Sequence, residues 1–367
     1  MIHTLELIRQ LNSDQLTLLL ESFGLSSCHL NSTTTERPVV CRRNFRIGFK
    51  SIIVFRRGEI PNAEYYAVIR MEPQMVLEEH RTINLFKATE YNVHALQNTF
   101  REVMLRLLGY DDETLANLSE WNCRRIDYSL NIYFDTETNL NLFLEMSKKT
   151  SRYVRKKLKR LVTIPMNQQS TAEGNQSVKV MFYHKRQQVQ CVYNLIPAEE
   201  NQRLIDDSTL IVRFEVQCKS SKTHTLKRKY GFESRCILNY LNENIAHEIL
   251  LTEYLNSVGR GDFYSRYHAE KKINQSNFCK SKKTRLLHCL MLISRARHIS
   301  NAEEQFISGA YIRHNHNTVL VKGSKNTFRN YRKALESLGI NPMLIPKERR
   351  VTRLRNPIFQ VERCYSN

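Results

Sequence analysis

Regular alternation of apolar and polar residues in three segments constrains the fold of this chain most strongly. Residues 124–134, 178–190 and 209–219 read RRIDYSLNIYF, VKVMFYHKRQQVQ and TLIVRFEVQCK. Successive side chains of a β-strand point to opposite faces of its sheet, so this period predicts strands with one apolar and one polar face. Such a sheet must cover its apolar face with other elements.

Strand and helix patterns interleave along the chain as far as about residue 220. Residues 46–56 and 64–72 read as further strands, and residues 91–108 and 137–160 read as helices. We therefore predict an α+β fold with a central, mostly antiparallel sheet flanked by helices. Helical patterns dominate after residue 230, which gives three predicted parts: a sheet domain at 1–240, a helical connector at 241–280 and a mainly helical C-terminal domain at 281–367.

The charge balance narrows the class of partner. Among 367 residues, 56 Lys and Arg stand against 36 Asp and Glu, which gives a formal net charge of +20. An excess of this size predicts polyanionic partners, and nucleic acid is the leading one. No run of about 18 apolar residues and no signal-like segment is found, so we expect a cytoplasmic protein with no membrane partner. The absence of a G-x-x-x-x-G-K-[S/T] motif argues against an NTP-driven motor.

The cysteines give no sign of a metal site. None of the nine lies within nine residues of another, so the paired spacing of a zinc site is missing. We expect free thiols, most of them buried, in a reducing compartment.

Four strands carry polar residues two positions apart. The pairs are Arg70/Glu72, Arg125/Asp127, Tyr183/Lys185 and Arg213/Glu215. If the strands are neighbours, their polar face combines acids, cations and one phenol. Carboxylates can hold Mg²⁺ or Mn²⁺, Arg and Lys can bind phosphates, and a phenolate near such cations can act as a nucleophile. Together these groups describe a site that nicks DNA.

Simpler interpretations compete with this one. An antiparallel sheet with one solvated face commonly pairs Arg with carboxylates across strands and needs no further function. A basic chain can also bind an origin or other nucleic acid without catalysis, mainly through phosphate contacts. Both alternatives lack a role for the hydroxyl of Tyr183.

The same segments resemble a known family. RRIDYSLNIYF, VKVMFYHKRQQVQ, STLIVRFEVQCKSSKTHTLKRKYGF and, more faintly, YYAVIRMEPQMVLEEH are similar, in the same order, to segments of the filamentous-phage gene II and gene X replication initiators. The resemblance covers about residues 45–235, with a weaker echo in SKNTFRNYRKALESLGI. It extends to rolling-circle initiators of Gram-positive plasmids, which share an R-x-D strand, a tyrosine-bearing strand and an R-x-E strand.

The resemblance implies a rolling-circle replication initiator with an HUH-like nicking endonuclease domain in degenerate form. Such a protein nicks one strand of a double-stranded origin, stays attached through a 5′-phosphotyrosine, leaves a 3′-OH primer and later rejoins the strand. The implied partners are the origin and its single-stranded nick region, with a host helicase, polymerase and single-strand-binding protein. A homodimer, a phage or plasmid source, and a conjugative relaxase-like nickase are left open.

Position by position, the resemblance assigns roles to individual residues. Tyr183 matches the nicking tyrosine. Lys185, two residues on, joins the catalytic candidates from the strand pattern rather than from the resemblance. Asp127 and Glu215 match the family's acidic positions and are expected metal ligands. The accompanying arginines of the family correspond to Arg125 and Arg213.

The sequence departs from wider relatives at the metal site. Their His-hydrophobic-His motif is missing, and Glu72 in RMEP and His80 downstream are the remaining candidate ligands for Mg²⁺ or Mn²⁺. His3 stands where an acid was expected, and we assign it no role. Tyr133 and Tyr193 lie near the same strands, but we expect both to be packing aromatics.

Two basic segments leave alternatives open. Residues 148–160, KKTSRYVRKKLKR, form either a phosphate-tracking surface or a solvated helix end. Residues 327–340, TFRNYRKALESLGI, place an apolar stripe on a helix with Arg329, Arg332 and Lys333 off the stripe. We expect a packing helix here rather than the recognition helix of a helix-turn-helix unit.

Overall fold

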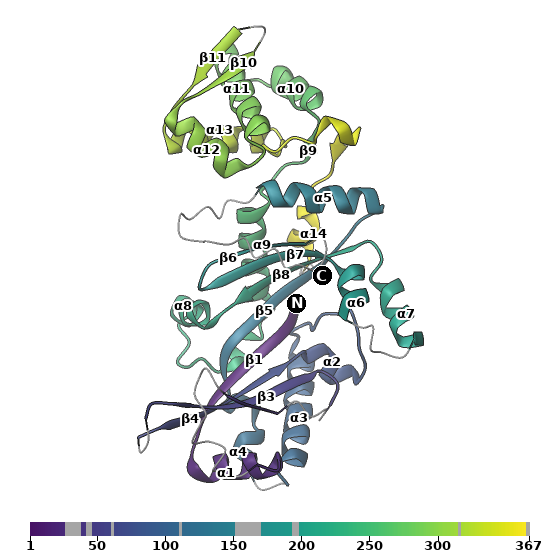
Figure 1. Ribbon diagram of the computed structural model, residues 1–367, viewed down its shortest axis with the longest axis vertical. Coiled ribbons are helices and arrows are strands. Elements are labelled where there is room, and N and C mark those ends of the chain that lie inside the picture. Colours follow the sequence, from purple (N-terminus) through teal and green to yellow (C-terminus); the bar gives the residue numbers. More distant parts are fainter. Residues whose placement is uncertain are drawn as a thin grey trace.

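An eight-stranded sheet forms the centre of the computed structural model, which describes residues 1–25, 38–41, 46–59, 62–109, 112–150, 170–192, 198–314 and 317–364. All of its strand pairs are antiparallel, and their order is β2-β3-β4-β1-β5-β8-β7-β6 (Figure 1). The predicted α+β fold with an antiparallel central sheet is confirmed. The strands are β1 (Ile2–Leu11), β2 (Val39–Cys41), β3 (Phe49–Arg57), β4 (Glu64–Met71), β5 (Asn122–Tyr133), β6 (Ser170–Gly174), β7 (Val178–His184) and β8 (Ile211–Cys218).

Helices cover the apolar face of this sheet. Phe182 of β7 and Phe214 of β8 stack with ring centroids 4.7 Å apart, and Tyr254 of α9 (Glu243–Ser257) meets both rings edge-on. At the other end of the sheet, Phe100 of α3 (Glu90–Leu107) packs on Phe49 of β3. Further helices of this domain are α1 (Ser13–Ser22), α4 (Glu113–Ala116), α5 (Glu137–Thr150) and α8 (Ser220–Tyr230).

The polar face is covered too, which the sequence did not predict. Ile83, Val189, Leu204 and Ile211 form a small apolar cluster on this side of β8. They come from the segment after α2 (Pro73–Glu78), from α6 (Lys185–Val192), from α7 (Ala198–Asp207) and from the strand itself. The polar side chains beneath are therefore buried, and the interpretation as an open, solvated sheet surface does not hold there.

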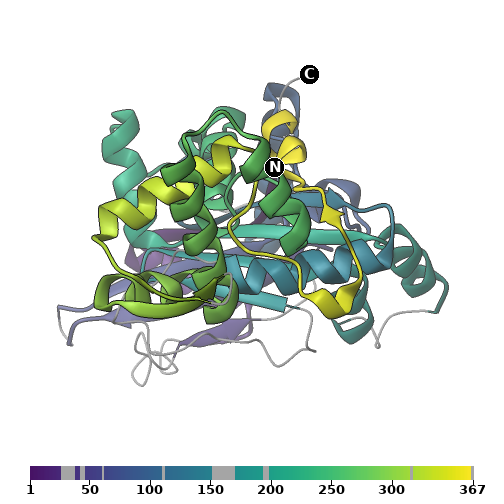
Figure 2. The same ribbon diagram turned by 90° about the horizontal axis from the view of Figure 1, so that it is seen from above.

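A second, mainly helical unit lies beyond α5, at the top of Figure 1. Figure 2 looks down on it and shows its green and yellow-green helices in front of the sheet domain. Arg349 Nη2 lies 2.7 Å from Glu145 Oε2 of α5 and joins the two parts. The unit contains α10 (Arg266–Gln275), α11 (Lys280–Ala296), α12 (Ile299–Ser308), the hairpin of β10 (Ala310–His314) and β11 (Asn317–Val321), α13 (Lys325–Ser337), and β9 (Phe263–Tyr264) paired with β12 (Arg353–Leu354).

The predicted domain limits differ from this arrangement. Helix α9 lies in the predicted connector but packs on β5 and β8, because it buries apolar side chains such as Tyr254 against the sheet. The chain then leaves for the second unit and returns, since α14 (Ile358–Arg363) packs on α9 and β5. Both ends of residues 241–367 therefore contact the sheet domain.

Several local predictions need correction. The strand predicted over 178–190 ends at His184, and α6 begins at Lys185. The strand predicted from residue 209 begins at Ile211, because Leu210 has a left-handed φ of 58°. Arg332, predicted to lie off the apolar stripe of α13, is buried. The predicted helix over 137–160 is described only to Thr150, so most of the basic segment at 148–160 lies outside the described residues.

Two expectations from composition can be compared with the structure. The seven cysteines whose state is described are all free thiols, and three of them are buried: Cys123, Cys218 and Cys289. Free thiols are thus confirmed there, but burial holds for fewer than half of them. In the described part of the chain no helix combines the length and the apolar character needed to cross a membrane.

Candidate functional site

The strand register brings the predicted residues together on the polar face. Strand β8 lies between β5 and β7, and Arg213 of β8 stands opposite Asn131 of β5 and Tyr183 of β7. Glu215 lies two residues further along β8, on the same face. The Tyr183 hydroxyl donates a hydrogen bond to Glu215 Oε2 at 3.1 Å. The predicted nucleophile and one predicted acid are therefore in direct contact.

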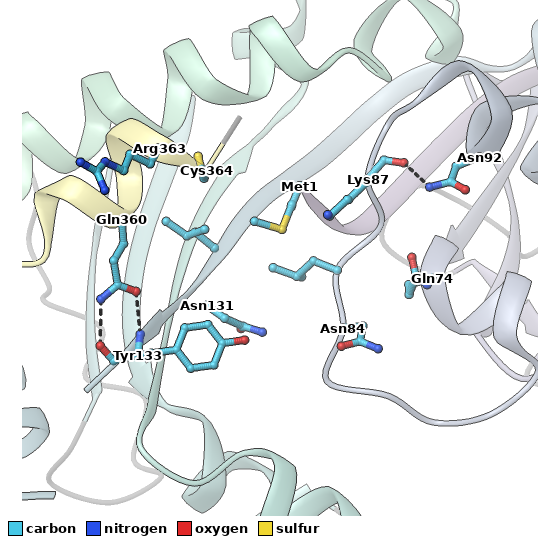
Figure 3. A pocket seen from close by; sticks show the side chains of 12 residues that line it. Met1, Gln74, Asn84, Lys87, Asn92, Asn131, Tyr133, Gln360, Arg363 and Cys364 are labelled. Atoms are coloured by element: carbon cyan, nitrogen blue, oxygen red, sulfur yellow. Dashed lines mark hydrogen bonds between the residues drawn. The ribbon is translucent and has the colours of Figure 1, made fainter. Parts of the chain in front are cut away.

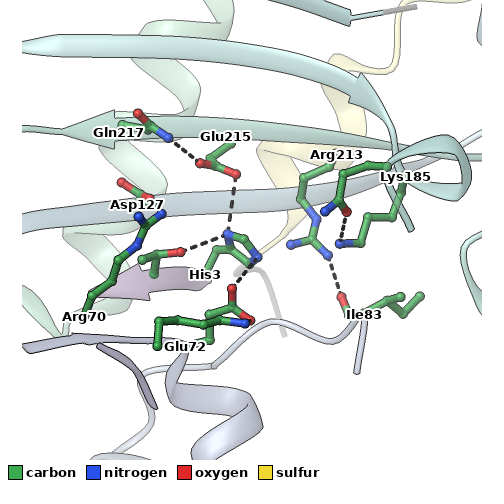
Figure 4. A network of polar contacts seen from close by, with 12 residues as sticks. His3, Arg70, Glu72, Ile83, Asp127, Lys185, Arg213, Glu215 and Gln217 are labelled. Atoms are coloured by element: carbon green, nitrogen blue, oxygen red, sulfur yellow. Dashed lines mark hydrogen bonds and ion pairs between the residues drawn. The ribbon is translucent and has the colours of Figure 1, made fainter. Parts of the chain in front are cut away.

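Glu215 is held as a buried carboxylate. Gln217 Nε2 donates to Oε1 at 2.9 Å, and His3 Nδ1 lies 3.5 Å from Oε2 (Figure 4). Burial opposes ionisation, but the hydrogen bonds from His3 and Gln217 and the charge of Arg213 outweigh it, so the pKa of Glu215 falls well below its usual range. This side chain therefore offers a permanent negative charge.

The phenol of Tyr183 is neutral in this arrangement. Burial and the neighbouring charge of Glu215 raise its pKa well above the usual value, and Arg213 only partly opposes them. Because the phenolate is disfavoured, a nucleophilic role requires additional positive charge or a base when substrate binds.

His3 is the residue of this site that sequence reasoning missed. Ile2 pairs with Tyr128 and Thr4 pairs with the adjacent residue Asp127, so His3 is an extra residue of β1 without a partner on β5. This is a β-bulge, which re-aims a side chain. Counting back from Leu5 in steps of two would put His3 on the apolar face. Its imidazole instead stands between two carboxylates, since Nε2 lies 4.0 Å from Glu72 Oε1.

Glu72 forms the opposite wall of the site. It follows β4 at the start of α2 and does not cap that helix with its side chain. Lys50 Nζ lies 3.3 Å from Glu72 Oε2. Like His3, Lys50 is the extra residue of a β-bulge, because Phe49 pairs with Met71 and Ser51 pairs with Arg70, which leaves Lys50 without a partner on β4. Burial opposes ionisation of Glu72, but His3 and Lys50 lower its pKa overall.

Asp127 is close by but already engaged. Arg125 donates from Nε to Oδ1 at 2.8 Å and from Nη2 to Oδ2 at 2.6 Å, while Arg125 Nη1 reaches Glu6 at 3.2 Å. Asp127 is fully buried, and burial with the charge of Glu215 raises its pKa to about 7 despite Arg125. Both oxygens of this predicted metal ligand thus serve to hold Arg125.

Arg213 and Lys185 supply buried positive charge. Arg213 donates from Nε to Asn131 Oδ1 and from Nη2 to the Ile83 carbonyl, each at 2.6 Å, while buried Nη1 has no hydrogen-bond partner among the described residues. Lys185 Nζ donates to Gln188 at 2.8 Å. Burial and then Arg213 lower the pKa of Lys185 to about 7. The unpaired Nη1 can donate to an anion.

The other predicted residues lie elsewhere. His80 is half exposed, and its described contacts are with the carbonyl oxygen and carboxylate of Glu78. The prediction that Tyr133 packs in the interior is wrong, because this residue is 59% exposed at the end of β5. Tyr193 lies outside the described residues.

A pH-dependent stability test follows from Lys185. Its folded pKa of about 7 lies below the usual lysine value of 10.5. The unfolded chain therefore binds more protons than the folded one between these two pH values, and stability rises with pH there. The Lys185→Met variant has no ionisable group at this position and therefore lacks this pH-dependent contribution to stability. We expect the wild type to gain about 2 kcal/mol relative to the variant between pH 6 and pH 9. Urea unfolding at both pH values measures the gain, and a difference that does not change with pH would contradict it.

The donor types at this site fit a hard divalent ion, but the donors do not yet converge. The two carboxylates are the donors that Mg²⁺ and Mn²⁺ prefer, and the buried Glu72 Oε2 accepts no well-formed hydrogen bond from the described residues. The carboxylates of Glu72 and Glu215 approach opposite nitrogens of His3. Accordingly, no group of three His, Cys, Asp or Glu residues in the described ranges forms a ready metal site.

Comparisons with known proteins add no relative. No protein-family model matches the chain, no curated protein is significantly similar to it, and no solved structure matches its fold. The resemblance to phage and plasmid initiators therefore stays a prediction.

Proposed function

We propose that this protein is a rolling-circle replication initiator that nicks one strand of its origin with Tyr183. The observation that carries the proposal is the 3.1 Å hydrogen bond between the Tyr183 hydroxyl and Glu215, on a sheet face that also holds Arg213, with Lys185 close by at the start of α6. An acceptor for the phenol and cations for a phosphate are the groups that a tyrosine nuclease needs. The HUH-like identity of the domain is part of this proposal.

The reaction exchanges one phosphoester for another. The phenolic oxygen attacks the phosphorus, the bond to the 3′ oxygen breaks, and the products are a 5′-phosphotyrosine and a 3′-OH. The phenolic proton passes to a base as substrate binds, and the leaving 3′ oxygen takes up a proton. We assign this transfer to the neutral form of Lys185, whose Nζ donates to Gln188 in the unbound protein and whose pKa is about 7. Attack of a 3′-OH on the phosphotyrosine reverses these steps and rejoins the strand.

The other residues position the reacting groups. Arg213 Nη1, which is buried and unpaired among the described residues, donates to a phosphate oxygen. Glu215 orients the phenol, and the Arg125–Asp127 pair supports the neighbouring strand. Glu72, Glu215 and His3 would hold Mg²⁺ or Mn²⁺, which when bound offsets negative charge on the phosphodiester.

The proposal extends to partners and location. A net charge of +20 suits contact with double-stranded origin DNA and with the single strand at the nick. Replication from the 3′-OH would require a host helicase, polymerase and single-strand-binding protein in the cytoplasm of a bacterial host. A conjugative relaxase-like nickase would use the same site chemistry with different partners.

A non-catalytic origin-binding protein is the second candidate. It is favoured by the raised pKa of Tyr183 and by the cover over the polar face, since both oppose nucleophilic attack in the unbound protein. Under this alternative the buried network of Glu215 and Arg213 only stabilises the fold.

Incubation with supercoiled DNA of the protein's own replicon separates the candidates. With Mg²⁺ or Mn²⁺ present, we expect nicked circles that carry covalently bound protein. Proteolysis and mass spectrometry should then find the DNA on the peptide containing Tyr183. Retarded DNA that stays supercoiled and free of covalent protein would instead support the binding protein.

A further inference from the structure

A separate pocket opens at the end of β5 (Figure 3). Its volume is about 510 Å³, within the range of small-molecule sites. Asn131 and Tyr133 of β5 form one wall, Asn84 and Lys87 of the segment before α3 form another, and Arg363 of α14 lies on the third. None of the roles proposed above uses this pocket.

Tyr133 presents its aromatic ring to the pocket from a backbone that is held in place. Its backbone nitrogen donates to Gln360 Oε1 at 2.9 Å, and Gln360 Nε2 donates to its carbonyl oxygen at 2.8 Å. These two bonds tie the backbone of β5 to α14, while the residue remains 59% exposed. An exposed ring on a held backbone is a platform on which a nucleobase can stack.

Polar groups around the ring complete the recognition chemistry. Lys87 and Arg363 are exposed, and neither takes part in the ion pairs found among the described residues. The Asn84 side chain, also exposed, points its amide toward the pocket. An aromatic face, an amide and unpaired cations match the base, the base edge and the phosphate of a nucleotide.

The pocket adjoins the proposed nicking site through Asn131. Asn131 lines the pocket and also accepts the 2.6 Å hydrogen bond from Arg213. Asn131, Arg213 and Tyr183 stand in one row across three adjacent strands. Neighbouring strands are about 4.8 Å apart, so the backbones of Asn131 and Tyr183 are separated by about 10 Å. A short single strand that reaches Tyr183 can therefore also enter the pocket.

We infer that the pocket holds a nucleotide of the strand that Tyr183 nicks, with its base stacked on Tyr133 and its phosphate bound by Lys87 and Arg363. This inference rests on the proposed function for the identity of the strand. The recognised chemistry is that of a nucleoside phosphate, which a DNA strand and a free nucleotide share. Binding experiments without nicking separate these two sources.

The test uses the full-length protein with EDTA, so that no strand is cut. Fluorescence anisotropy measures binding of oligothymidine of about 10 nucleotides, and of an abasic strand of equal length. We expect Tyr133→Leu to weaken oligothymidine binding about tenfold, and Tyr133→Phe, which keeps the ring, to stay within about twofold. Neither variant should change binding of the abasic strand. Tyr311→Leu, at an exposed tyrosine of the β10–β11 hairpin, is the matched control.

A second variant tests the phosphate contact. Lys87→Gln should lower the slope of log affinity against log salt by about one unit and weaken binding to both strands. An unchanged slope would remove the assigned role of Lys87.

Three results would overturn the inference. In the first, Tyr133→Leu binds oligothymidine as tightly as the wild type. In the second, Tyr133→Leu loses as much affinity for the abasic strand as for oligothymidine. In the third, Tyr133→Leu weakens binding of thymidine monophosphate but not of oligothymidine. The last result would assign the pocket to a free nucleotide. The binding assays contain EDTA and do not depend on nicking. If the protein does not nick DNA, they still show whether the pocket binds a base, and if the pocket fails to bind a base, the nicking assay still tests catalysis.

Discussion

Replacing Tyr183 by phenylalanine is expected to abolish both the nicking of supercoiled origin DNA and the covalent DNA–protein adduct. The variant loses only the hydroxyl that donates to Glu215, and the ring keeps its place on β7. Because the oxygen would be the nucleophile, we expect nicking to fall at least about a thousandfold, as for other removed nucleophiles. Gel separation of nicked from supercoiled circles measures the first effect, and denaturing gels with labelled DNA measure the second.

The control for this prediction is another tyrosine. Tyr91→Phe changes a residue on α3 that is 82% exposed and makes none of the site contacts, so it should nick like the wild type. Duplex affinity of Tyr183→Phe should stay within about twofold of the wild type, because phosphate contacts dominate such binding. An adduct that persists in Tyr183→Phe would refute the assignment of the nucleophile. Unchanged duplex binding without nicking by the wild type would favour the non-catalytic alternative.

Replacing Arg125 by methionine is expected to give the largest loss of stability. The substitution leaves the fully buried carboxylate of Asp127 without its two hydrogen-bond donors. Removing one partner of a buried ion pair costs about 3–5 kcal/mol, because the remaining charge stays desolvated. Urea unfolding of the variant and the wild type at pH 8 measures this difference.

Two further variants make the Arg125 test specific. Arg106→Met breaks an exposed pair with Glu102 and should cost about 1 kcal/mol or less. The double variant Arg125→Met with Asp127→Leu removes both charges, and we expect it to recover most of the lost stability. A double variant as unstable as Arg125→Met alone would show that packing, rather than the unpaired charge, causes the loss.

The Arg125 effect should depend on pH in a defined direction. The pKa of Asp127 is already raised to about 7, from the usual aspartate value of 3.8. A carboxyl with a raised folded pKa stabilises the fold at low pH and loses that contribution as the pH rises through the folded value. Protonation also neutralises the unpaired carboxyl, so the loss in Arg125→Met should be smaller at pH 5 than at pH 8.

Strand alternation predicted the central sheet and the facing of most of its residues. In β5 and β8 the period of two placed Asp127 and Glu215 on one face, as the register confirms. The same period identified Tyr183 as a neighbour of Glu215, provided that β7 and β8 are adjacent. Adjacency itself depends on contacts between distant segments, which a local pattern does not contain.

The two bulges explain why the site was only partly predicted. His3 and Lys50 reach the carboxylates of Glu215 and Glu72 because each stands at an irregularity in strand pairing. A bulge interrupts the period of two, so the rule that placed Glu215 correctly gives the wrong face for His3. The only sequence signals were the single histidine at position 3 and the missing His-hydrophobic-His motif. Neither signal indicates on which face of the sheet His3 lies.

The sequence by itself determined an α+β chain of high positive charge with an antiparallel sheet, because alternation and composition are local properties of the residues. Only the tertiary structure decided that the polar face is covered, that His3 stands between two acids, and that Tyr133 lines a pocket. These features arise where segments far apart in the chain meet, as β1 meets β5 and α14 meets the end of β5. Burial and register at such meetings are set by packing of the whole domain, which no single segment encodes.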